Sequence, residues 1–212
     1  MARARGLFAC GPGRAVLLAA LALLVACGPD IPDAYTPRAG DVLFQSLPPS
    51  LLADVIEGTT HSPFSHCGIV AGQGEDFLVL EAFQSVRATP LEDFLARGRG
   101  GAFSVYRFGP ELAARVPAIL RAAEAYHGRP YDMRYEPGDS AIYCSELVHL
   151  AVRDATGVEV GAFVTLGELD WEPHAEVIEQ IEGGPPPLER PLLTPRALSE
   201  APELVLALEH GW

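Results

Sequence analysis

The 212-residue chain contains no lysine, so its fifteen basic residues are all arginine. This absence excludes lysine Schiff-base chemistry and the lysine of a phosphate-binding loop. Basic charge is also scarce overall, because 28 acidic residues leave a formal net charge of -13. A phosphate backbone would be repelled by such a chain, and a nucleic-acid partner is not expected. The four cysteines have no close pairing in sequence, which argues against a structural zinc site or a disulfide framework.

The chain has the length and the apolar content of one folded domain. It is 49% hydrophobic and long enough to bury a core. Patterns typical of strands are followed by patterns typical of helices, which indicates an α+β fold. Strands are expected at 42–44, 66–71, 77–82 and 103–107. Helices are expected at 51–57, 90–97 with Thr89 as the N-cap, 110–127, 140–155 and from 194 onward.

The N-terminal segment has the layout of a secretory signal. Arg3, Arg5 and Arg14 precede an apolar run over 15–26, which is too short to span a bilayer comfortably. The run ends in Leu-Val-Ala-Cys, which resembles a bacterial lipobox, with Cys27 as the lipidated residue. The other interpretation is a plain signal peptide with a chance cysteine.

These features divide the chain into four parts. We expect a lipoprotein signal peptide at 1–26, a lipidated tether at 27–38, a folded domain at 39–206 and a C-terminal tail at 207–212. Residue 28 is Gly rather than Asp, so the inner-membrane retention signal of enteric bacteria is missing. The predicted location is the cell envelope, anchored by lipid at the periplasmic face of the outer membrane. Removal of three arginines with the signal makes the mature charge -13 - 3 = -16, so the anchor has to be the lipid and not a basic patch.

Cys144 is the strongest candidate for a nucleophile. It lies near the start of a predicted helix, where the partial positive charge of the helix N-terminus lowers the pKa of a thiol. A thiolate is the form that a cysteine nucleophile needs. The competing interpretation is a buried structural cysteine.

His66 and Glu81 could complete a triad with this thiol. His66 opens one strand, Glu81 ends the next, and the hairpin turn at 72–74 would bring both to the open end of the hairpin. A carboxylate there would hold the imidazole in the productive tautomer. Cys67 adjoins His66 and should point to the opposite face of its strand. We interpret Cys67 as a small core residue; the opposite direction argues against pairing with Cys144 but leaves a disulfide open.

Six segments occur in the order found in the YiiX/YebB-like family of permuted papain-fold cysteine hydrolases, relatives of the NlpC cell-wall peptidases. The chain resembles this family from about residue 39 to 206, with tail motifs near 194–198 and 201–204 that also look similar. The six segments are Gly-Asp-Val-Leu-Phe-Gln (40–45), Ser-Pro-Phe-Ser-His-Cys-Gly-Ile (62–69), Val-Leu-Glu-Ala (79–82), Thr-Pro-Leu (89–91), Gly-Arg-Pro-Tyr-Asp (128–132) and Tyr-Cys-Ser-Glu-Leu-Val (143–148).

The resemblance implies a small antiparallel sheet or partial barrel packed against helices, a permuted papain-like fold. It also implies that Cys144 is the nucleophile, His66 the general base and acid, and Glu81 the orienting group. Tyr131 and Tyr143 become candidates for contact with the substrate or the oxyanion. This chemistry calls for no metal and no cofactor. Cys67 stands where the family commonly has an aliphatic residue.

The sequence leaves the substrate open. A peptidoglycan peptide and an acyl-lipid amide or ester are both compatible with an envelope protein of this fold, as are hydrolysis and acyl transfer. A catalytically idle binding module is a further alternative, although no triad residue is missing. The oligomeric state is not predicted. Pocket shape should discriminate, since a narrow polar groove favours peptide and an apolar tunnel favours acyl chains.

Overall fold

The computed structural model describes residues 31–212 except 75 and 137, so the expected signal peptide and Cys27 lie outside the described residues. Its centre is a six-stranded antiparallel sheet with the strand order β4-β3-β2-β1-β5-β8. The strands are β1 (Val42–Gln45), β2 (His66–Gln73), β3 (Asp76–Phe83), β4 (Ser85–Pro90), β5 (Phe103–Phe108) and β8 (Leu204–His210). A separate two-stranded sheet pairs β6 (Val164–Thr165) with β7 (Pro191–Leu192).

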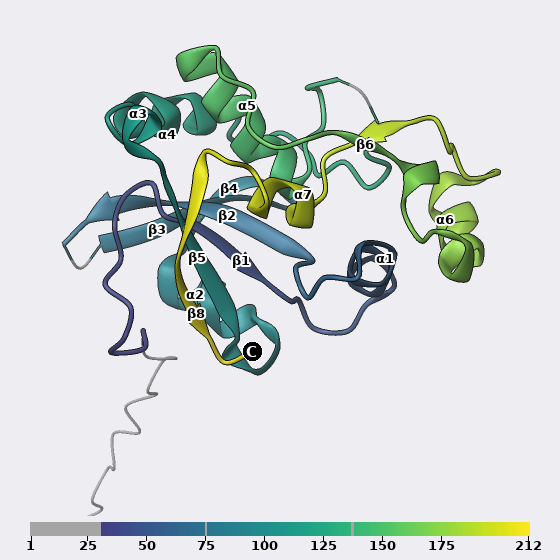
Figure 1. The fold of residues 1–212 in the computed structure, drawn as a ribbon, viewed down its shortest axis with the longest axis horizontal. Coiled ribbons are helices and arrows are strands. Elements are labelled where there is room, and N and C mark those ends of the chain that lie inside the picture. The colour runs from purple at the N-terminus through teal and green to yellow at the C-terminus, as the bar shows by residue number, and fades with distance from the viewer. Residues whose placement is uncertain (1–30, 75, 137) are drawn as a thin grey trace, which may run out of the picture.

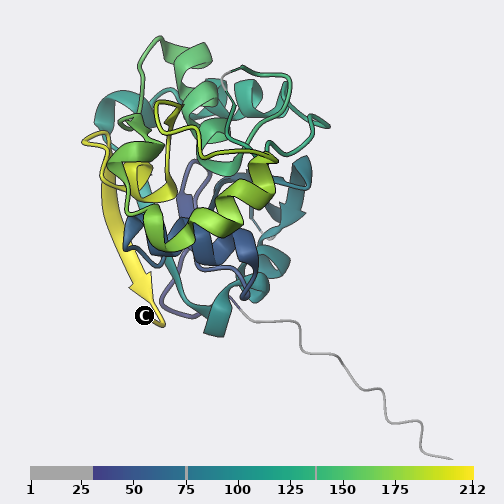
Figure 2. The ribbon, with the colours of Figure 1, turned by 90° about the vertical axis from the view of Figure 1, so that its right-hand side faces the viewer.

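Helices cover both faces and one end of this sheet (Figure 1). In Figure 1, α5 lies above the sheet, α2 lies below it, and α1 and α6 lie beyond one end. In Figure 2 that end faces the viewer, with α6 in front of α1. The helices are α1 (Leu51–Thr60), α2 (Leu91–Arg97), α3 (Pro110–Ala113), α4 (Val116–Glu124), α5 (Cys144–Thr156), α6 (Ala175–Glu182) and α7 (Pro195–Ser199), with single 3-10 turns at Arg99–Gly101, Leu166–Glu168 and Glu172–His174.

Alternation along the strands builds two cores, one on each face of the sheet. One core packs strand residues such as Phe44, Cys67 and Ile69 against α4 and α5. The other packs residues such as Leu43 and Val70 against α2. Successive side chains of a strand point to opposite faces, so β1 and β2 supply both cores at once. The sheet packed between helices confirms the predicted α+β fold.

The structure corrects several predicted element boundaries. The expected helix over 110–127 is two helices, α3 and α4, because the chain kinks before Pro117. The strand β4 is an addition to the expected strands, and it includes the predicted helix cap: Thr89 donates its hydroxyl to Glu81 instead of capping α2. The helix α6 lies between residues 157 and 194, where the sequence analysis expects no helix.

The predicted tether and tail are also shorter than expected, since both ends of the domain pack. Tyr35, placed in the tether, is buried against Phe103 with ring centroids 5.6 Å apart, and its hydroxyl donates to Asp41 at 3.1 Å. The strand β8 runs past residue 206 to His210, and the Trp212 indole donates to the Ser104 hydroxyl at 2.8 Å. The predicted tail is therefore part of the sheet edge.

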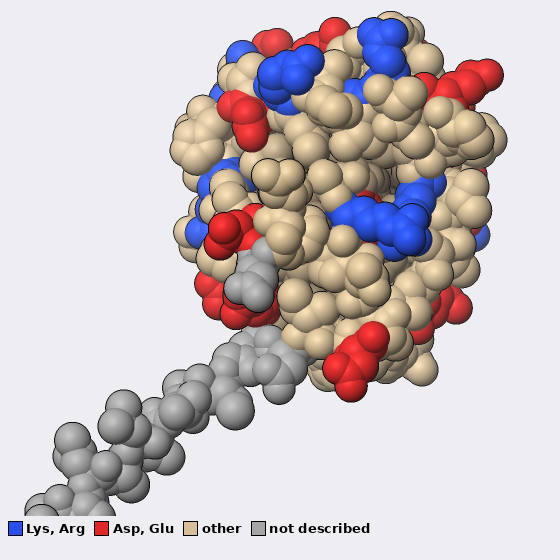
Figure 3. Space-filling model, turned by 90° about the vertical axis from the view of Figure 1, so that its left-hand side faces the viewer, with Lys and Arg blue, Asp and Glu red and all other residues tan. Residues whose placement is uncertain are grey.

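Charged groups on the face seen in Figure 3 are interspersed, with small clusters of arginine among carboxylates and uncharged surface. None of the described helices combines the length and the apolarity that crossing a membrane requires.

Candidate active site

His66 is placed by the first residue of β2. The backbone at this end of the strand is fixed by pairing with β1, where His66 lies opposite Gln45. The imidazole points to the α2 face and is only 2% exposed. It lies between two aromatic rings, with centroid distances of 5.8 Å to Phe83 and 5.6 Å to Phe94. A ring held on two sides in this way has little freedom to rotate.

Glu81 on β3 binds this imidazole directly, as the hairpin argument predicted. Its Oε2 lies 2.6 Å from Nε2 of His66, and the carboxylate is completely buried. The register pairs Ile69 with Leu80, which sets Gly68 opposite Glu81. A Cβ at Gly68 would come within 2.5 Å of a Val79 methyl, so only glycine leaves this position clear.

Two further groups, which the sequence did not single out, hold the carboxylate of Glu81. Arg97, the last residue of α2, donates to Oε2 at 2.5 Å, and the hydroxyl of Thr89 donates to Oε1 at 2.5 Å. The Arg97 guanidinium also lies over the Phe83 ring, 4.1 Å from its centroid. A buried carboxylate with this many donors stays ionised and fixed in orientation.

Cys144 is the first residue of α5 and lies on the other face of the sheet. The helix begins here because Tyr143 is extended and the Glu146 side chain accepts a hydrogen bond from the Tyr143 backbone N–H at 3.4 Å. Gly157 ends the helix with φ 77. The position at the helix N-terminus was predicted, and there the free backbone N–H groups favour negative charge on the sulfur.

The thiol and the imidazole perturb one another's protonation. Burial alone would lower the pKa of His66, but hydrogen bonds with Cys144 and Glu81 outweigh it and raise this pKa to about 9. Burial likewise would raise the pKa of Glu81, yet its bonds to His66 and Arg97 lower it to about 2. The pKa of the Cys144 thiol lies well below its usual range, because the Cys67 thiol and His66 both hydrogen-bond the sulfur. With Nε2 bound to Glu81, Nδ1 of His66 is the atom left for the thiol.

Cys67 requires a correction. It does point away from His66, as predicted, but it shares its core with Cys144 and hydrogen-bonds that thiol. The interpretation of Cys67 as a buried core residue is confirmed, but its opposite direction does not keep it away from Cys144, since both thiols lie in the same core. Both cysteines are free thiols, and burial raises the pKa of Cys67.

The tyrosines of the site divide into two kinds. Tyr143 is buried, with its hydroxyl accepting the Leu193 backbone N–H at 3.1 Å, so it packs the helix start and does not line the cleft. Tyr131 and Tyr135 lie in the loop before α5, with their hydroxyls 3.4 Å apart. Burial raises the pKa of both, which keeps these hydroxyls protonated and able to donate. Tyr135, which the sequence did not indicate, adopts φ 56, a strained conformation for tyrosine.

A cleft opens directly onto His66. The loop carrying Tyr131 is fixed beside it, because the Tyr131 N–H donates to the Gln84 carbonyl at 2.9 Å. The α1 side of the cleft is held by Glu57, which accepts hydrogen bonds from Ser46 at 2.6 Å and Ser65 at 2.8 Å. The cleft is lined by Leu47, Ser50, Leu52, Ala53, Ile56, Ser65, His66, Phe83, Gln84, Tyr131 and Met133.

A helix-borne thiol facing a strand-borne imidazole, with a buried carboxylate behind the ring, is the arrangement of the papain-like cysteine hydrolases. Comparison with known proteins makes the class specific. Residues 36–207 match the model of a family described as permuted papain-like amidase enzymes, YaeF/YiiX, C92 family. The chain belongs to this family, as the sequence motifs indicated.

Two relatives from Escherichia coli agree with this assignment. The uncharacterized protein YiiX of strain K12 is 32% identical over 174 residues, which cover 81% of this chain and 86% of that protein. A crystal structure of the protein from strain O157:H7, described there as metalloprotein yiiX, superposes with a TM-score of 0.77 at 31% identity, covering 83% of this chain and 99% of that one.

Proposed function

We propose that this protein is a cysteine amidase that acts through Cys144, His66 and Glu81. The observation that carries the proposal is the position of His66, which bonds Glu81 at 2.6 Å. A hydrogen bond with the Cys144 thiol also contributes to the raised pKa of this imidazole. The raised pKa of the imidazole and the lowered pKa of the thiol favour a thiolate–imidazolium pair. That pair is the resting form a thiol nucleophile needs for attack.

In the first half-reaction the Cys144 thiolate attacks the substrate carbonyl carbon. Backbone N–H groups at the start of α5 stabilise the oxyanion, and the Tyr131 hydroxyl is a further donor. The imidazolium of His66 then gives its proton to the departing amine as the C–N bond breaks. The products are a thioester on Cys144 and a free amine, with His66 neutral.

In the second half-reaction His66 takes a proton from water, whose oxygen attacks the thioester carbon. The C–S bond breaks, the carboxylic acid leaves, and the thiolate–imidazolium pair is restored. Glu81 keeps Nε2 protonated throughout and stabilises the imidazolium without changing its own protonation.

The E. coli O157:H7 relative is described as a metalloprotein, which raises the question of a metal in this chain. Within residues 31–74, 76–136 and 138–212, no three His, Cys, Asp or Glu side chains converge as a metal site would require. The donor set therefore does not fit a metal centre in the described part of the molecule, and no step of the proposed mechanism involves one.

We further propose that Cys27 anchors the protein to the envelope by lipid. The support is the order Leu-Val-Ala-Cys at the end of an apolar run. Metabolic labelling with a palmitate analogue should tag the wild type and leave Cys27→Ser untagged. A tag that persists in Cys27→Ser would remove this part of the proposal.

The amidase is tested by trapping its thioester. The full chain in detergent is mixed with p-nitrophenyl acetate, an activated ester with the same acyl carbon chemistry, and quenched in acid for intact-mass analysis. We expect one acetyl group on Cys144 at short times and steady release of nitrophenol.

Cys67→Ala is the matched control, because it removes the neighbouring thiol and leaves the nucleophile. It should still be acetylated, whereas Cys144→Ala should not. Acetylation of Cys144→Ala, or its absence in both the wild type and Cys67→Ala, would contradict the proposed nucleophile.

A further inference from the structure

The loop before α5 holds Tyr135 in a strained backbone conformation. Its φ of 56° lies in the left-handed region, which a residue with a bulky side chain rarely adopts. Of the other non-glycine residues that the structure describes, only His61 and Gln84 have a positive φ. A position that merely had to turn the chain would be occupied at lower cost by Gly or Asn. The strain at this position is therefore retained for the tyrosine side chain.

A buried carboxylate keeps the loop in this conformation. Asp132 accepts the backbone N–H of Arg134 at 2.9 Å and that of Glu136 at 2.6 Å, so both neighbours of Tyr135 are tied to one side chain. The backbone of Asp132 is anchored in turn, because its N–H donates to the Ile142 carbonyl at 3.3 Å. These bonds fix the backbone around residue 135, which is what a strained conformation needs in order to persist.

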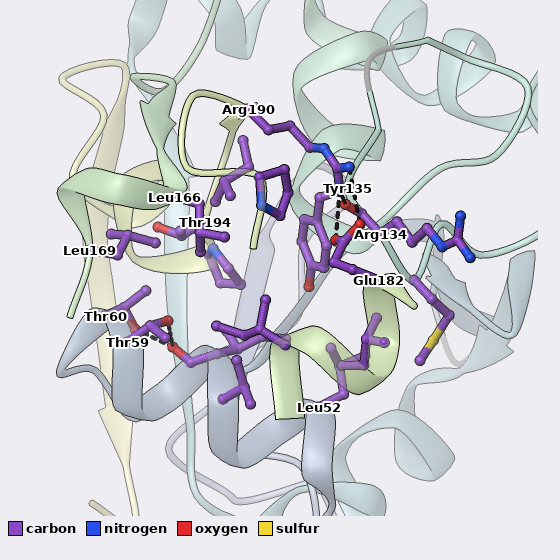
Figure 4. Close-up of a pocket in the computed structure, with 18 residues that line it drawn as sticks. Leu52, Thr59, Thr60, Arg134, Tyr135, Leu166, Leu169, Glu182, Arg190 and Thr194 are labelled. Carbon is purple, nitrogen blue, oxygen red and sulfur yellow. Dashed lines mark hydrogen bonds and ion pairs between the residues drawn. The ribbon is translucent and has the colours of Figure 1, made fainter. Parts of the chain in front are cut away.

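The side chain of Tyr135 reaches from the start of α5 to the cleft. Its ring packs on Tyr143, the residue before Cys144, with the ring centroids 4.3 Å apart. Figure 4 shows the ring extending from its loop toward α1, with the hydroxyl at the far end. That hydroxyl lies 3.4 Å from the hydroxyl of Tyr131, which lines the cleft together with His66. Tyr135 thus contacts both the start of the nucleophile helix and the tyrosine that faces the cleft.

The two hydroxyls can share one hydrogen bond with each other, which leaves one hydroxyl proton free. With Tyr135 as the donor, the oxygen of Tyr131 accepts and the proton of Tyr131 can point into the cleft. A hydroxyl that accepts a hydrogen bond is polarised and becomes a better donor itself. The separation of 3.4 Å is long for two hydroxyls, as catalytic hydrogen bonds often are before a substrate is bound.

Both hydroxyls also lie near the sulfur of Cys144. Burial is the main reason why the pKa of each tyrosine is raised, and negative charge on Cys144 raises both pKa values further. Both tyrosines therefore keep their protons at neutral pH. A protonated hydroxyl near the attacking sulfur is also near the carbonyl oxygen, which becomes negative when the thiolate adds to the carbon.

We infer that Tyr135 is a positioning residue for the oxyanion: its hydroxyl donates to Tyr131 and so aims the Tyr131 proton at the substrate oxygen. The inference rests on the proposed function, in which Tyr131 is one donor to the oxyanion. Neither tyrosine gives up its proton in the reaction. The hydrogen bond from Tyr131 strengthens as the carbonyl oxygen becomes negative and weakens again when the thioester forms.

The test compares two reactions of the Cys144 thiolate, of which only one develops an oxyanion. Acetylation by p-nitrophenyl acetate passes through a tetrahedral oxyanion, whereas alkylation by iodoacetamide displaces iodide and forms none. Tyr135→Phe removes the hydroxyl and keeps the ring. In the full chain in detergent, this variant should slow acetylation of Cys144 about fivefold, the contribution of one hydrogen bond, and leave the alkylation rate unchanged.

A double-mutant cycle shows whether Tyr135 acts through Tyr131. Tyr131→Phe removes the donor itself and should slow acetylation by about 10²-fold. The double variant should be no slower than Tyr131→Phe alone, because the hydroxyl of Tyr135 then has nothing left to orient. Tyr126→Phe is the matched control, since Tyr126 donates its hydroxyl to Asp154 near the end of α5 and lines no part of the cleft. It should change neither rate.

Three results would overturn the inference: unchanged acetylation in Tyr135→Phe or in Tyr131→Phe, an equal loss in acetylation and alkylation, or losses that multiply in the double variant. Tyr135 would then act through packing or on the thiol itself, and the proposed function would stand, because wild-type Cys144 is still acetylated. A wild type that is alkylated but not acetylated at Cys144 would contradict the proposed function, and this inference with it. Circular dichroism and thermal unfolding check that each variant is folded.

Discussion

The two faces of the central sheet each supply half of the candidate site, and the halves are held by different forces. On the α2 face, His66 and Glu81 are fixed by hydrogen bonds and by the charge of Arg97. On the α5 face, Cys144 is fixed by the start of a helix whose first nine residues are all buried. We call His66 and Glu81 the polar half of the site and Cys144 the nucleophile half. Activity should therefore be sensitive to substitutions that change the charge of the polar half without changing its shape. In the nucleophile half, activity should be sensitive to substitutions that change the thiol or its packing.

The largest expected effect comes from removing either the Cys144 thiol or the His66 imidazole, which interact across the two faces of the sheet. Cys144→Ala removes the nucleophile, and His66→Ala leaves a thiol without its base. Each should lower kcat/KM by at least about 10⁴-fold, and the double variant should be no worse than either alone, because the two act as a unit. Ester hydrolysis measures this, with circular dichroism as the check on folding. Additive losses in the double variant would show that the residues act separately.

Glu81→Gln alters only the polar half. The amide has nearly the same shape but cannot stabilise the imidazolium and can present the wrong hydrogen-bonding atom. We expect a loss of about 10²-fold or more in kcat, by analogy with triad carboxylates. Acetylation of Cys144 should slow to a similar degree. Full activity in folded Glu81→Gln would move the orienting role to another residue.

The pH profile sharpens the comparison. In the wild type, Glu81 has a pKa of about 2 and stays ionised over the working pH range. Activity should fall as the pH rises through about 9, because His66 then loses its proton and can no longer protonate the leaving amine. Arg97→Met removes an opposite charge from Glu81, so the pKa of Glu81 should rise by about 1 or more.

The acid limb of the Arg97→Met profile should then move to higher pH, because the carboxylate protonates earlier and the imidazolium loses its partner. Arg97→Lys, which keeps the charge, is the control and should stay near the wild-type profile. If Arg97→Met and Arg97→Lys shift the acid limb of the pH profile by the same amount, Arg97 acts through its packing against Phe83 and not through its charge.

The smallest effect is expected from Cys67→Ala on the nucleophile half. Its thiol hydrogen-bonds the Cys144 sulfur, and loss of that donor should raise the pKa of Cys144. The midpoint of the pH dependence of iodoacetamide alkylation should shift to higher pH by less than about 1 unit, and kcat should fall a few-fold at most. An unchanged alkylation curve would assign the low pKa to His66 and the helix start alone.

The sequence could place the polar half because its geometry is local. A hairpin carries His66 and Glu81 on adjacent strands, so their proximity follows from counting residues around a turn. The thiol could be placed at a helix start, but not on a particular face of the sheet, since nothing in the chain states how α5 packs. This is why the sequence did not show that Cys67 and Cys144 share one core, whereas the predicted alternation along β2 is confirmed.

Arg97, Thr89 and Tyr135 could not have been found in this way. Arg97 ends a short helix and looks like any exposed cation at a helix C-terminus, and only the packing of α2 under β3 brings it to Glu81. Thr89 has the sequence context of a helix cap, although its hydroxyl binds Glu81.

The order of residues along the chain has a consequence for biogenesis. A chain is synthesised from its N-terminus, so His66, Glu81 and strands β1 to β5 exist before Cys144 does. The strand β7 and the edge strand β8 come later still. The base and the carboxylate of the proposed triad thus precede its nucleophile in the chain, and the Cys144 thiol joins a hairpin whose strands have already been synthesised.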